Sequence, residues 1–206
     1  GVSGETLVYS TTPFDDDTLL TLWRYRIGDT ERYPLITRRM TERARTMHHF
    51  SLSSTAVAWY DSSIAPAGLF AMNLEGGELI SLTSVRCVCY GDPQLVGRQV
   101  VYEGWQTGFR DIWLVDIDTL EERNLTSFGA PQTSPAFDGR WVLWVDSRND
   151  PGSDPALTPV NSDLYAMTLP DGEEVEAPSP AWAPGRRDAA ASSVAVHVPL
   201  LAVIST

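Results

Sequence analysis

The chain contains no lysine, and several other absences limit what it can do. Its 206 residues include 15 arginines and 27 acidic residues, which gives a formal net charge of −12. A general nucleic-acid binder needs a basic face for the phosphates, so this charge balance argues against that class. We attribute the exclusive use of arginine to coding bias, as in a GC-rich genome, rather than to function.

Long apolar runs are also missing. No stretch reaches the ~18 apolar residues of a membrane span, so we expect no membrane insertion. The sequence shows no signal peptide and begins with Gly1 rather than Met. Removal of a secretion signal would leave such a start, and we therefore expect a periplasmic or extracellular protein.

Nucleophilic and metal-binding motifs are equally scarce. There is no G-x-S-x-G elbow, and the adjacent His48 and His49 would face opposite sides of a strand. The two cysteines, Cys87 and Cys89, are too few for a structural zinc site. A disulfide between them would close a small strained ring. Free thiols in a loop are therefore the first alternative, and a local disulfide is the second. We expect no catalytic residue and no cofactor.

Calcium is the one ion that the acidic residues would suit. Asp146, Asp150, Asp154 and Asp163 bracket the segment Ser147–Ser162, and calcium prefers several oxygens from one flexible loop. The D-x-D-x-D-G spacing is absent, however. Asp111 and Asp163 occupy the same position of the repeat described next, so we expect them to bond turn backbone instead.

An internal repeat is the main feature of the sequence. Tyr9, Trp59, Tyr102 and Trp144 each lie in a short apolar run and are 50, 43 and 42 residues apart. A second run follows each of them, and Ile-Thr or Leu-Thr closes three of the units at 37, 83 and 126. Short strands with a period of ~40–50 residues are typical of a β-propeller.

Each unit has the pattern of four strands. The runs are four to seven residues long, rich in β-branched and aromatic residues, and separated by turns that contain glycine or aspartate. A further short element, which we assign as the innermost strand, lies before the second strand of three units, at 93–98, 134–140 and 179–185. A lone four-stranded unit cannot bury both of its faces, so neighbouring units are expected to stack.

One unit carries a family resemblance. Ser134-Pro135-Ala136-Phe137-Asp138-Gly139-Arg140, then Val142-Leu143-Trp144, then Asp163-Leu164-Tyr165, with the preceding Leu125-Thr126, resembles the TolB-like (WD-like) propeller repeat. The likeness covers most of residues 55–206 and, more loosely, the first fifty. It lacks the serine between the aromatic residue and Asp138. It implies an all-β propeller of four-stranded antiparallel blades and protein contacts through loops at one propeller face.

We predict a single propeller domain over residues 1–206, with four to five blades visible. The units are a partial one at 1–50, blades at about 51–92, 93–130 and 131–178, and a partial one at 179–206. We expect the chain to enter its first unit at a second strand. Ser193–Ser205 is expected to be strand that pairs either with Leu7–Ser10, closing the ring, or with a second subunit; otherwise the chain is part of a larger propeller.

Two functional hypotheses follow. The first is a non-enzymatic binding or assembly module with a protein partner, since loops on a rigid scaffold usually carry function. Its variable parts are the segments around Arg38–Arg45, Cys87–Pro93 and Ser147–Ser162. The partner-contact candidates are Arg38, Arg39, Arg43, Arg45, Trp105 and Arg148. The alternative is the gating or substrate-binding propeller of a hydrolase or lyase, such as a prolyl-oligopeptidase-like enzyme.

Overall fold

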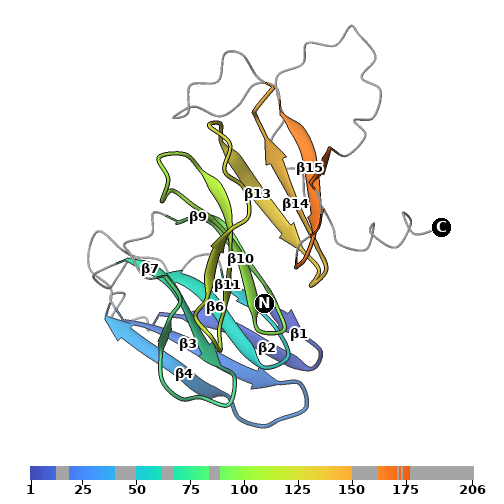
Figure 1. Ribbon diagram of the computed structural model, residues 1–206. Coiled ribbons are helices and arrows are strands. Elements are labelled where there is room, and N and C mark those ends of the chain that lie inside the picture. The colour runs from blue at the N-terminus through green and yellow to red at the C-terminus, as the bar shows by residue number, and fades with distance from the viewer. Residues whose placement is uncertain are drawn as a thin grey trace, which may run out of the picture.

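The computed structural model describes residues 1–12, 19–39, 50–61, 67–83, 89–149, 162–170, 172 and 174–176. All regular structure in these ranges is β-strand, arranged as four antiparallel four-stranded sheets (Figure 1). The predicted all-β fold of four-stranded antiparallel blades is confirmed. No helix among the described residues is long and apolar enough to cross a bilayer.

We number the sheets as blades in chain order. Blade 1 contains β1 (Val2–Ser3), β2 (Thr6–Thr11), β3 (Leu19–Arg26) and β4 (Tyr33–Arg39). Blade 2 contains β5 (Phe50–Leu52), β6 (Ala56–Asp61), β7 (Gly68–Asn73) and β8 (Ile80–Ser81). Blade 3 contains β9 (Cys89–Val96), β10 (Gln99–Gly104), β11 (Asp111–Asp116) and β12 (Glu122–Asn124). Blade 4 contains β13 (Gln132–Phe137), β14 (Trp141–Asp146), β15 (Asp163–Thr168) and β16 (Val175–Glu176).

The repeat of the sequence is also a repeat of strand register. Within each blade, every strand pairs with the next one in the chain. The first aromatic residue of each unit lies opposite a second one on the following strand: Tyr9 opposite Trp23, Trp59 opposite Phe70, Tyr102 opposite Trp113, and Trp144 opposite Tyr165. One aromatic pair therefore occupies the same place in all four blades.

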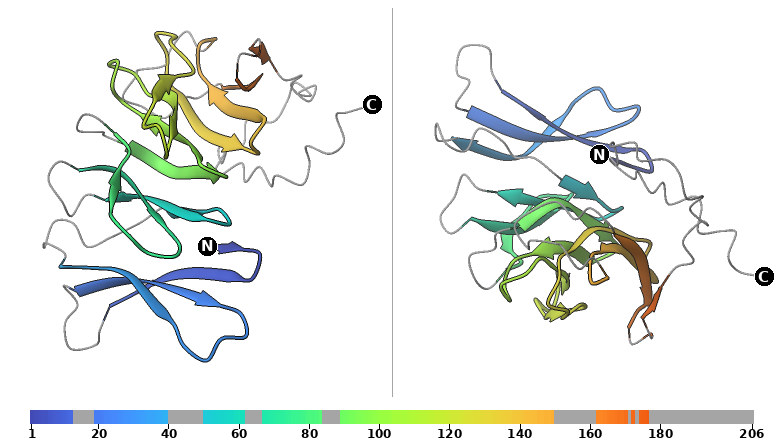
Figure 2. Two further views of the ribbon diagram at one scale, coloured as in Figure 1. Left: turned by 60° about the horizontal axis from the view of Figure 1, so that its bottom comes forward. Right: turned by 90° about the horizontal axis from the view of Figure 1, so that it is seen from above.

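The blades stack face to face in chain order and form an open arc (Figure 2). Three apolar clusters fill the interfaces, one between each pair of neighbours. In the first, Val8 and Leu22 of blade 1 lie with Trp59 of blade 2; in the third, Val101 of blade 3 lies with Trp144 of blade 4. Both tryptophans are fully buried. Burial of a large apolar side chain stabilises by about 2–3 kcal/mol, so these interfaces hold the arc together.

The start of the chain differs from the expectation. Val2–Ser3 forms a short first strand that pairs with Thr6 and Leu7, so blade 1 has four strands rather than three. The amino group of Gly1 donates to the carbonyl of Val8 over 2.8 Å. Two residues are too few to show an alternation of apolar and polar positions, and the sequence pattern therefore did not reveal this strand.

The aspartate–glycine turn of the repeat has a clear physical cause in blade 4. The Asp138 carboxylate accepts hydrogen bonds from the backbone N–H groups of Arg140 and Trp141, over 2.8 and 2.7 Å. Gly139 has a φ of 97°, and a Cβ there would lie 3.0 Å from Val96 of blade 3. Glycine is thus required both by the turn and by the neighbouring blade. Ser53 takes the place of the aspartate in blade 2 and accepts from Thr55 and Ala56.

The up-and-down order of the strands gives each blade two different ends. The turns between first and second strands, and between third and fourth, lie at one end, which we call the turn end. The connections between second and third strands, and those that lead to the next blade, lie at the other, which we call the loop end. The described parts of the three variable segments predicted from the sequence, which are Arg38–Arg39, Cys89–Pro93 and Ser147–Asn149, therefore begin or end at the loop end.

Several predictions concern residues that the structure does not describe. Cys87, Ser179–Gly185 and Ser193–Ser205 lie outside the described ranges. Cys89 is the first residue of β9, and so is in a strand rather than in the expected loop.

Candidate functional site

Buried polar side chains gather at the loop end. Asp61, Glu103 and Asp146 are the last or next-to-last residues of second strands, and Asp111 begins a third strand. All four are at most 4% exposed. Thr83, Thr126, Gln132 and Ser147 add further buried polar groups near the same connections. Polar groups are costly to bury, so this concentration sets the loop end apart from the apolar interior of the stack.

Glu103 connects blade 3 to blade 4. One of its carboxylate oxygens accepts a hydrogen bond from the backbone N–H of Ser134 over 3.2 Å, and the other lies 3.5 Å from the Arg110 guanidinium. Burial raises the pKa of Glu103 to about 7, although the Ser134 hydrogen bond and the charge of Arg110 both act to lower it. A carboxyl with such a pKa can change protonation near neutral pH.

Ser134 has a backbone conformation that L-residues rarely adopt. Its φ is 55°, and the pairing of β13 with β14 is irregular between Thr133 and Ala136. The hydrogen bond from its N–H to Glu103 lies at this irregularity. Left-handed non-glycine residues are found disproportionately at functional sites, where surrounding contacts hold them in place.

Asp111 is bonded differently from what the sequence suggested. We expected its carboxylate to bond turn backbone, but it accepts from the side chains of Thr107 and Asn124, the latter over 3.1 Å. Burial raises its pKa, against the effect of both hydrogen bonds. Asp163, at the same repeat position, likewise accepts from a side chain, that of Asn149 over 3.0 Å. Both aspartates therefore hold the second-to-third-strand connection through side chains.

Arg148 fastens the corresponding connection of blade 4. Its guanidinium lies 2.5 Å from both Asp146 and Glu174, and it stacks 3.5 Å from the ring of Phe128 and 4.1 Å from that of Tyr165. Burial lowers the pKa of Arg148, but hydrogen bonds to the two carboxylates outweigh it and raise that pKa. The side chain is thus engaged within the chain, and its contact with a partner stays a prediction.

The other predicted contact residues lie apart from one another. Arg38 and Arg39 end β4 of blade 1 at the loop end, half-buried and exposed respectively. Trp105 follows β10 of blade 3 and is half-buried, with Arg110 6.0 Å from its ring centroid. Arg43 and Arg45 lie outside the described residues. The predicted residues that the structure describes thus share the loop end but do not form one cluster.

The aspartates that the structure describes give the calcium hypothesis little support. Asp150 and Asp154 lie outside the described ranges. The Asp146 carboxylate already accepts from Trp144 and Arg148, and Asp163 accepts from Asn149. In the parts of the chain that the structure describes, no group of three or more His, Cys, Asp or Glu side chains is close enough together to hold a metal ion.

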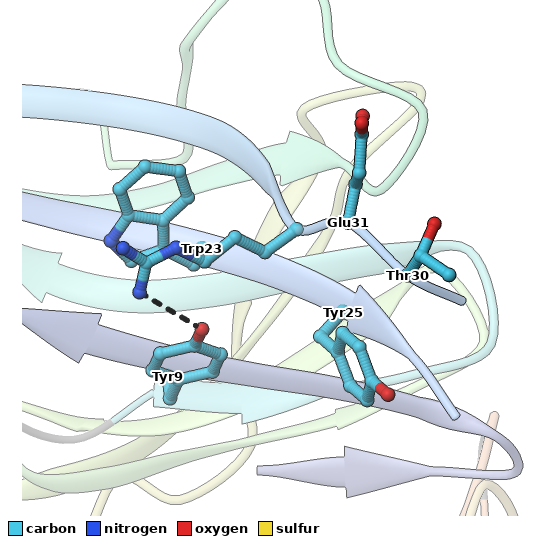
Figure 3. A pocket seen from close by; sticks show the side chains of 6 residues that line it. Tyr9, Trp23, Tyr25, Thr30 and Glu31 are labelled. Atoms are coloured by element: carbon cyan, nitrogen blue, oxygen red, sulfur yellow. Dashed lines mark hydrogen bonds between the residues drawn. The ribbon is translucent and has the colours of Figure 1, made fainter. Parts of the chain in front are cut away.

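A groove on blade 1 was not predicted from the sequence. It has a volume of about 510 Å³ and is lined by Tyr9, Trp23, Tyr25, Thr30, Glu31 and Arg32 (Figure 3). The Arg32 guanidinium lies 4.1 Å from the Trp23 ring centroid and donates to the Tyr9 hydroxyl over 3.4 Å. The indole N–H of Trp23 donates to Thr11 over 2.8 Å. The aromatic alternation at 23 and 25 was visible in the sequence, but the pairing register that puts Tyr9 beside it was not.

By sequence, the chain matches no protein-family model and no curated protein. Solved structures are nevertheless similar in fold. TolB from Acinetobacter baumannii matches 84% of this chain with a TM-score of 0.54 and 12% identity. The β-propeller domain of the Trilobed protease from Pyrococcus furiosus matches 85% with a TM-score of 0.56 and 14% identity. An oligogalacturonate lyase in complex with manganese matches 83% with a TM-score of 0.55 and 20% identity.

The fold is that of a TolB-like β-propeller. This confirms the family resemblance at the level of the fold. The chain spans 40% of the length of the A. baumannii TolB chain, 54% of the P. furiosus propeller chain and 49% of the lyase chain. Its four described blades therefore correspond to part of each of these larger structures. The similar structures include both a TolB and propellers of enzymes.

Proposed function

We propose that this chain is a non-enzymatic propeller module of the periplasm or extracellular space that binds a protein partner through its loop end. The observation that carries the proposal is topological. In every described blade the second strand ends and the third begins at this one end, and each fourth strand ends there where a further blade follows. A partner at the loop end could touch several blades at once, as binding loops on rigid scaffolds usually allow.

The turn end differs from the loop end in the contacts that its arginine residues make. Arginine side chains join neighbouring blades there: Arg24 lies 2.7 Å from Glu75, Arg98 donates to Asn73 over 2.7 Å, and Arg123 donates to the carbonyl of Pro170 over 2.7 Å. The pKa of Glu75 is lowered by its hydrogen bond to Arg24. These contacts join neighbouring blades at the end opposite to the loop end.

The charge of the chain indicates what kind of partner surface would fit. Residues 99–206 contain six arginines and sixteen acidic residues, a net charge of −10. Complementary potential speeds association and selects partners, so a protein with a basic contact face is favoured. At the described loop end, Phe128 is 43% exposed and the Arg148 guanidinium lies 3.5 Å from its ring, which offers an apolar contact there.

Site-specific photo-crosslinking in the native source tests the proposal. A photoreactive residue at Thr107 or Phe128 of the loop end should give one discrete adduct with the same partner from both positions. The matched positions are Leu120 and Glu121, which are exposed at the turn end. Adducts formed only from the turn-end positions would refute the proposal. Hydrolytic or lyase turnover by the purified chain would also refute it, provided that a substitution in the chain abolishes that turnover.

A second candidate is favoured by the similarity to the propellers of a protease and a lyase. In that case the chain is the gating or substrate-binding portion of an enzyme. The same photoreactive residue at Thr107 distinguishes the two, provided that the complete polypeptide is used. An adduct with an α/β-hydrolase domain of the same polypeptide supports the enzyme, whereas an adduct with a separate protein supports the binding module.

A further inference from the structure

We propose that the carboxyl group of Glu103 is a proton-controlled latch, which holds the 105–110 connection of the loop end against blade 4 when it is ionised and releases it when it is protonated. Each blade has a leading face, toward the preceding blade, and a trailing face, toward the following one. The latch acts where the trailing face of blade 3 meets blade 4. Its consequence for partner binding rests on the function proposed above, whereas the latch itself does not.

Glu103 continues a row of apolar side chains on blade 3. Val101, two positions earlier on β10, and Ile112, directly opposite Glu103 on β11, both pack in the apolar cluster between blades 3 and 4. Alternate residues of a strand share a face, so the Glu103 side chain lies on the trailing face as well. It is buried there. A buried carboxylate is costly unless neighbouring groups compensate its charge.

The two carboxylate oxygens of Glu103 contact two different parts of the loop end. One accepts a hydrogen bond from the backbone N–H of Ser134, on β13 of blade 4, over 3.2 Å. The other lies 3.5 Å from the guanidinium of Arg110, the last residue of the 105–110 connection. The carbonyl of Arg110 in turn accepts from the N–H of Gln132 over 2.7 Å. Glu103 therefore joins the connection to the same strand of blade 4 that its backbone contacts.

Few charges face Glu103 from the elements around it. Strand β13 has no titratable side chain, and on β11 Asp111 belongs to the leading face and Asp116 to the turn end. Strand β9 has three titratable residues, the second of which is the register partner of Glu103: Cys89, Tyr90 and Asp92. On β14, Asp146 is engaged within blade 4. Among the described residues, Arg110 is thus the charge that stabilises the ionised carboxyl.

Protonation of Glu103 removes the charge that holds Arg110. Burial outweighs the hydrogen bond from Ser134 and the charge of Arg110, and it raises the pKa of Glu103 to about 7. With that pKa, the carboxyl is about 90% protonated at pH 6 and about 10% protonated at pH 8. The neutral carboxyl no longer attracts the Arg110 side chain, which is 30% exposed. Trp105, whose ring centroid lies 6.0 Å from this guanidinium, changes its surroundings with it.

For a partner that docks on the 105–110 connection, the latch makes binding depend on pH. The ionised carboxyl holds the connection in one arrangement, so the partner should bind more tightly at pH 8 than at pH 6. Burial also raises the pKa of Asp111, which accepts from Thr107 of the same connection, so a change of pH alone does not isolate Glu103. The substitution Glu103→Gln does, because glutamine is neutral at every pH.

An NMR titration of the chain without a partner tests the latch. Three signals report on it: the side-chain carboxyl carbon of Glu103, the backbone amide of Ser134, and the fluorine of Trp105 in a chain labelled with fluorotryptophan. In the wild-type chain all three should change with one midpoint near pH 7. Trp141, at the turn end, is the matched control, and its fluorine signal should show no such midpoint.

Two variants separate the parts of the latch. Glu103→Gln should abolish the midpoint near pH 7 at both Ser134 and Trp105. Arg110→Gln should abolish it at Trp105 but leave a transition at Ser134, and it should raise the pKa of Glu103 because the favourable charge is gone. Glu121→Gln, at an exposed turn position, should leave all three signals as in the wild type.

Three results would overturn the proposal. They are a Glu103 carboxyl that titrates near its ordinary pKa of 4.5, a Trp105 signal that does not follow the Glu103 transition, and a Trp105 midpoint near pH 7 that persists in Glu103→Gln. These measurements use the chain alone, so they decide on the latch whether or not the loop end binds a partner. A partner that binds elsewhere contradicts only the proposed function.

Discussion

Glu103 is an acidic residue that the fold buries, and burial disfavours its charged form. It is 4% exposed, its carboxylate is shared between Ser134 and Arg110, and burial raises its pKa to about 7. The sequence showed only a glutamate near the end of a strand. Its burial depends on blade 4 covering blade 3, which is a contact between segments some thirty residues apart, and no local pattern could predict it.

The raised pKa predicts a specific pH dependence of stability. In the unfolded chain Glu103 ionises near pH 4.5, and in the folded chain near pH 7. Between these values the folded state binds more protons than the unfolded state, so the Glu103 contribution to stability falls as the pH rises. Glu103→Gln removes this loss, and should be more stable than wild type at pH 8 by on the order of 2 kcal/mol.

Urea unfolding at pH 4, 6 and 8 measures this effect. The difference between variant and wild type should be smallest at pH 4 and should grow with pH, while all other acids cancel in the comparison. Glu121→Gln, at an exposed turn position, is the control and should change stability little at any of the three pH values. A difference between Glu103→Gln and wild type that is the same at all three would contradict the assigned burial.

At the scale of the element, the threonine that closes three of the units explains part of the repeat. The hydroxyl oxygens of Thr83 and Thr126 accept hydrogen bonds from the backbone N–H groups of Leu69 and Ile112, over 3.4 and 2.9 Å. Leu69 and Ile112 are equivalent positions, so the Leu-Thr ending fastens the last part of blades 2 and 3 to their third strands. In blade 1 the Thr37 hydroxyl bonds Thr21 instead, over 3.0 Å.

Removal of one closing hydroxyl should therefore destabilise the blade. Thr126→Val keeps the shape of the side chain but leaves the buried N–H of Ile112 without this acceptor, which costs about 1–3 kcal/mol. Thr133→Val is the control, since Thr133 is a half-buried strand residue. Chemical unfolding of both variants checks the prediction, and equal stabilities for the two would show that the hydroxyl of Thr126 has no such role.

The elements themselves were largely predictable, and the exceptions have physical reasons. Strands around Trp59, Tyr102 and Trp144 follow from β-branched and aromatic runs bounded by turn residues. The two-residue strand β1 is too short to show a period. The partners of Asp111 were missed because they come from Thr107 and Asn124, on different strands or loops. The groove of blade 1 required the register between Tyr9 and Trp23, which repeat spacing alone does not give.

At the scale of the whole molecule, the order of the blades follows from one repeated interface. Aromatic residues on each leading face meet aliphatic residues on the preceding trailing face, and this pairing fixes both the sequence of blades and their common orientation. All loops of one kind consequently meet at one end. The arrangement separates the turn end from the loop end.

Hydrogen–deuterium exchange of this chain with and without its crosslinked partner tests the central claim, binding through the loop end, most directly. The partner should slow exchange at 105–110 and 125–131, which are loop-end connections of blade 3. Exchange at the turn-end segments 117–121 and 138–140 should be unchanged. Protection confined to 117–121 and 138–140, with none at 105–110 or 125–131, would contradict the account.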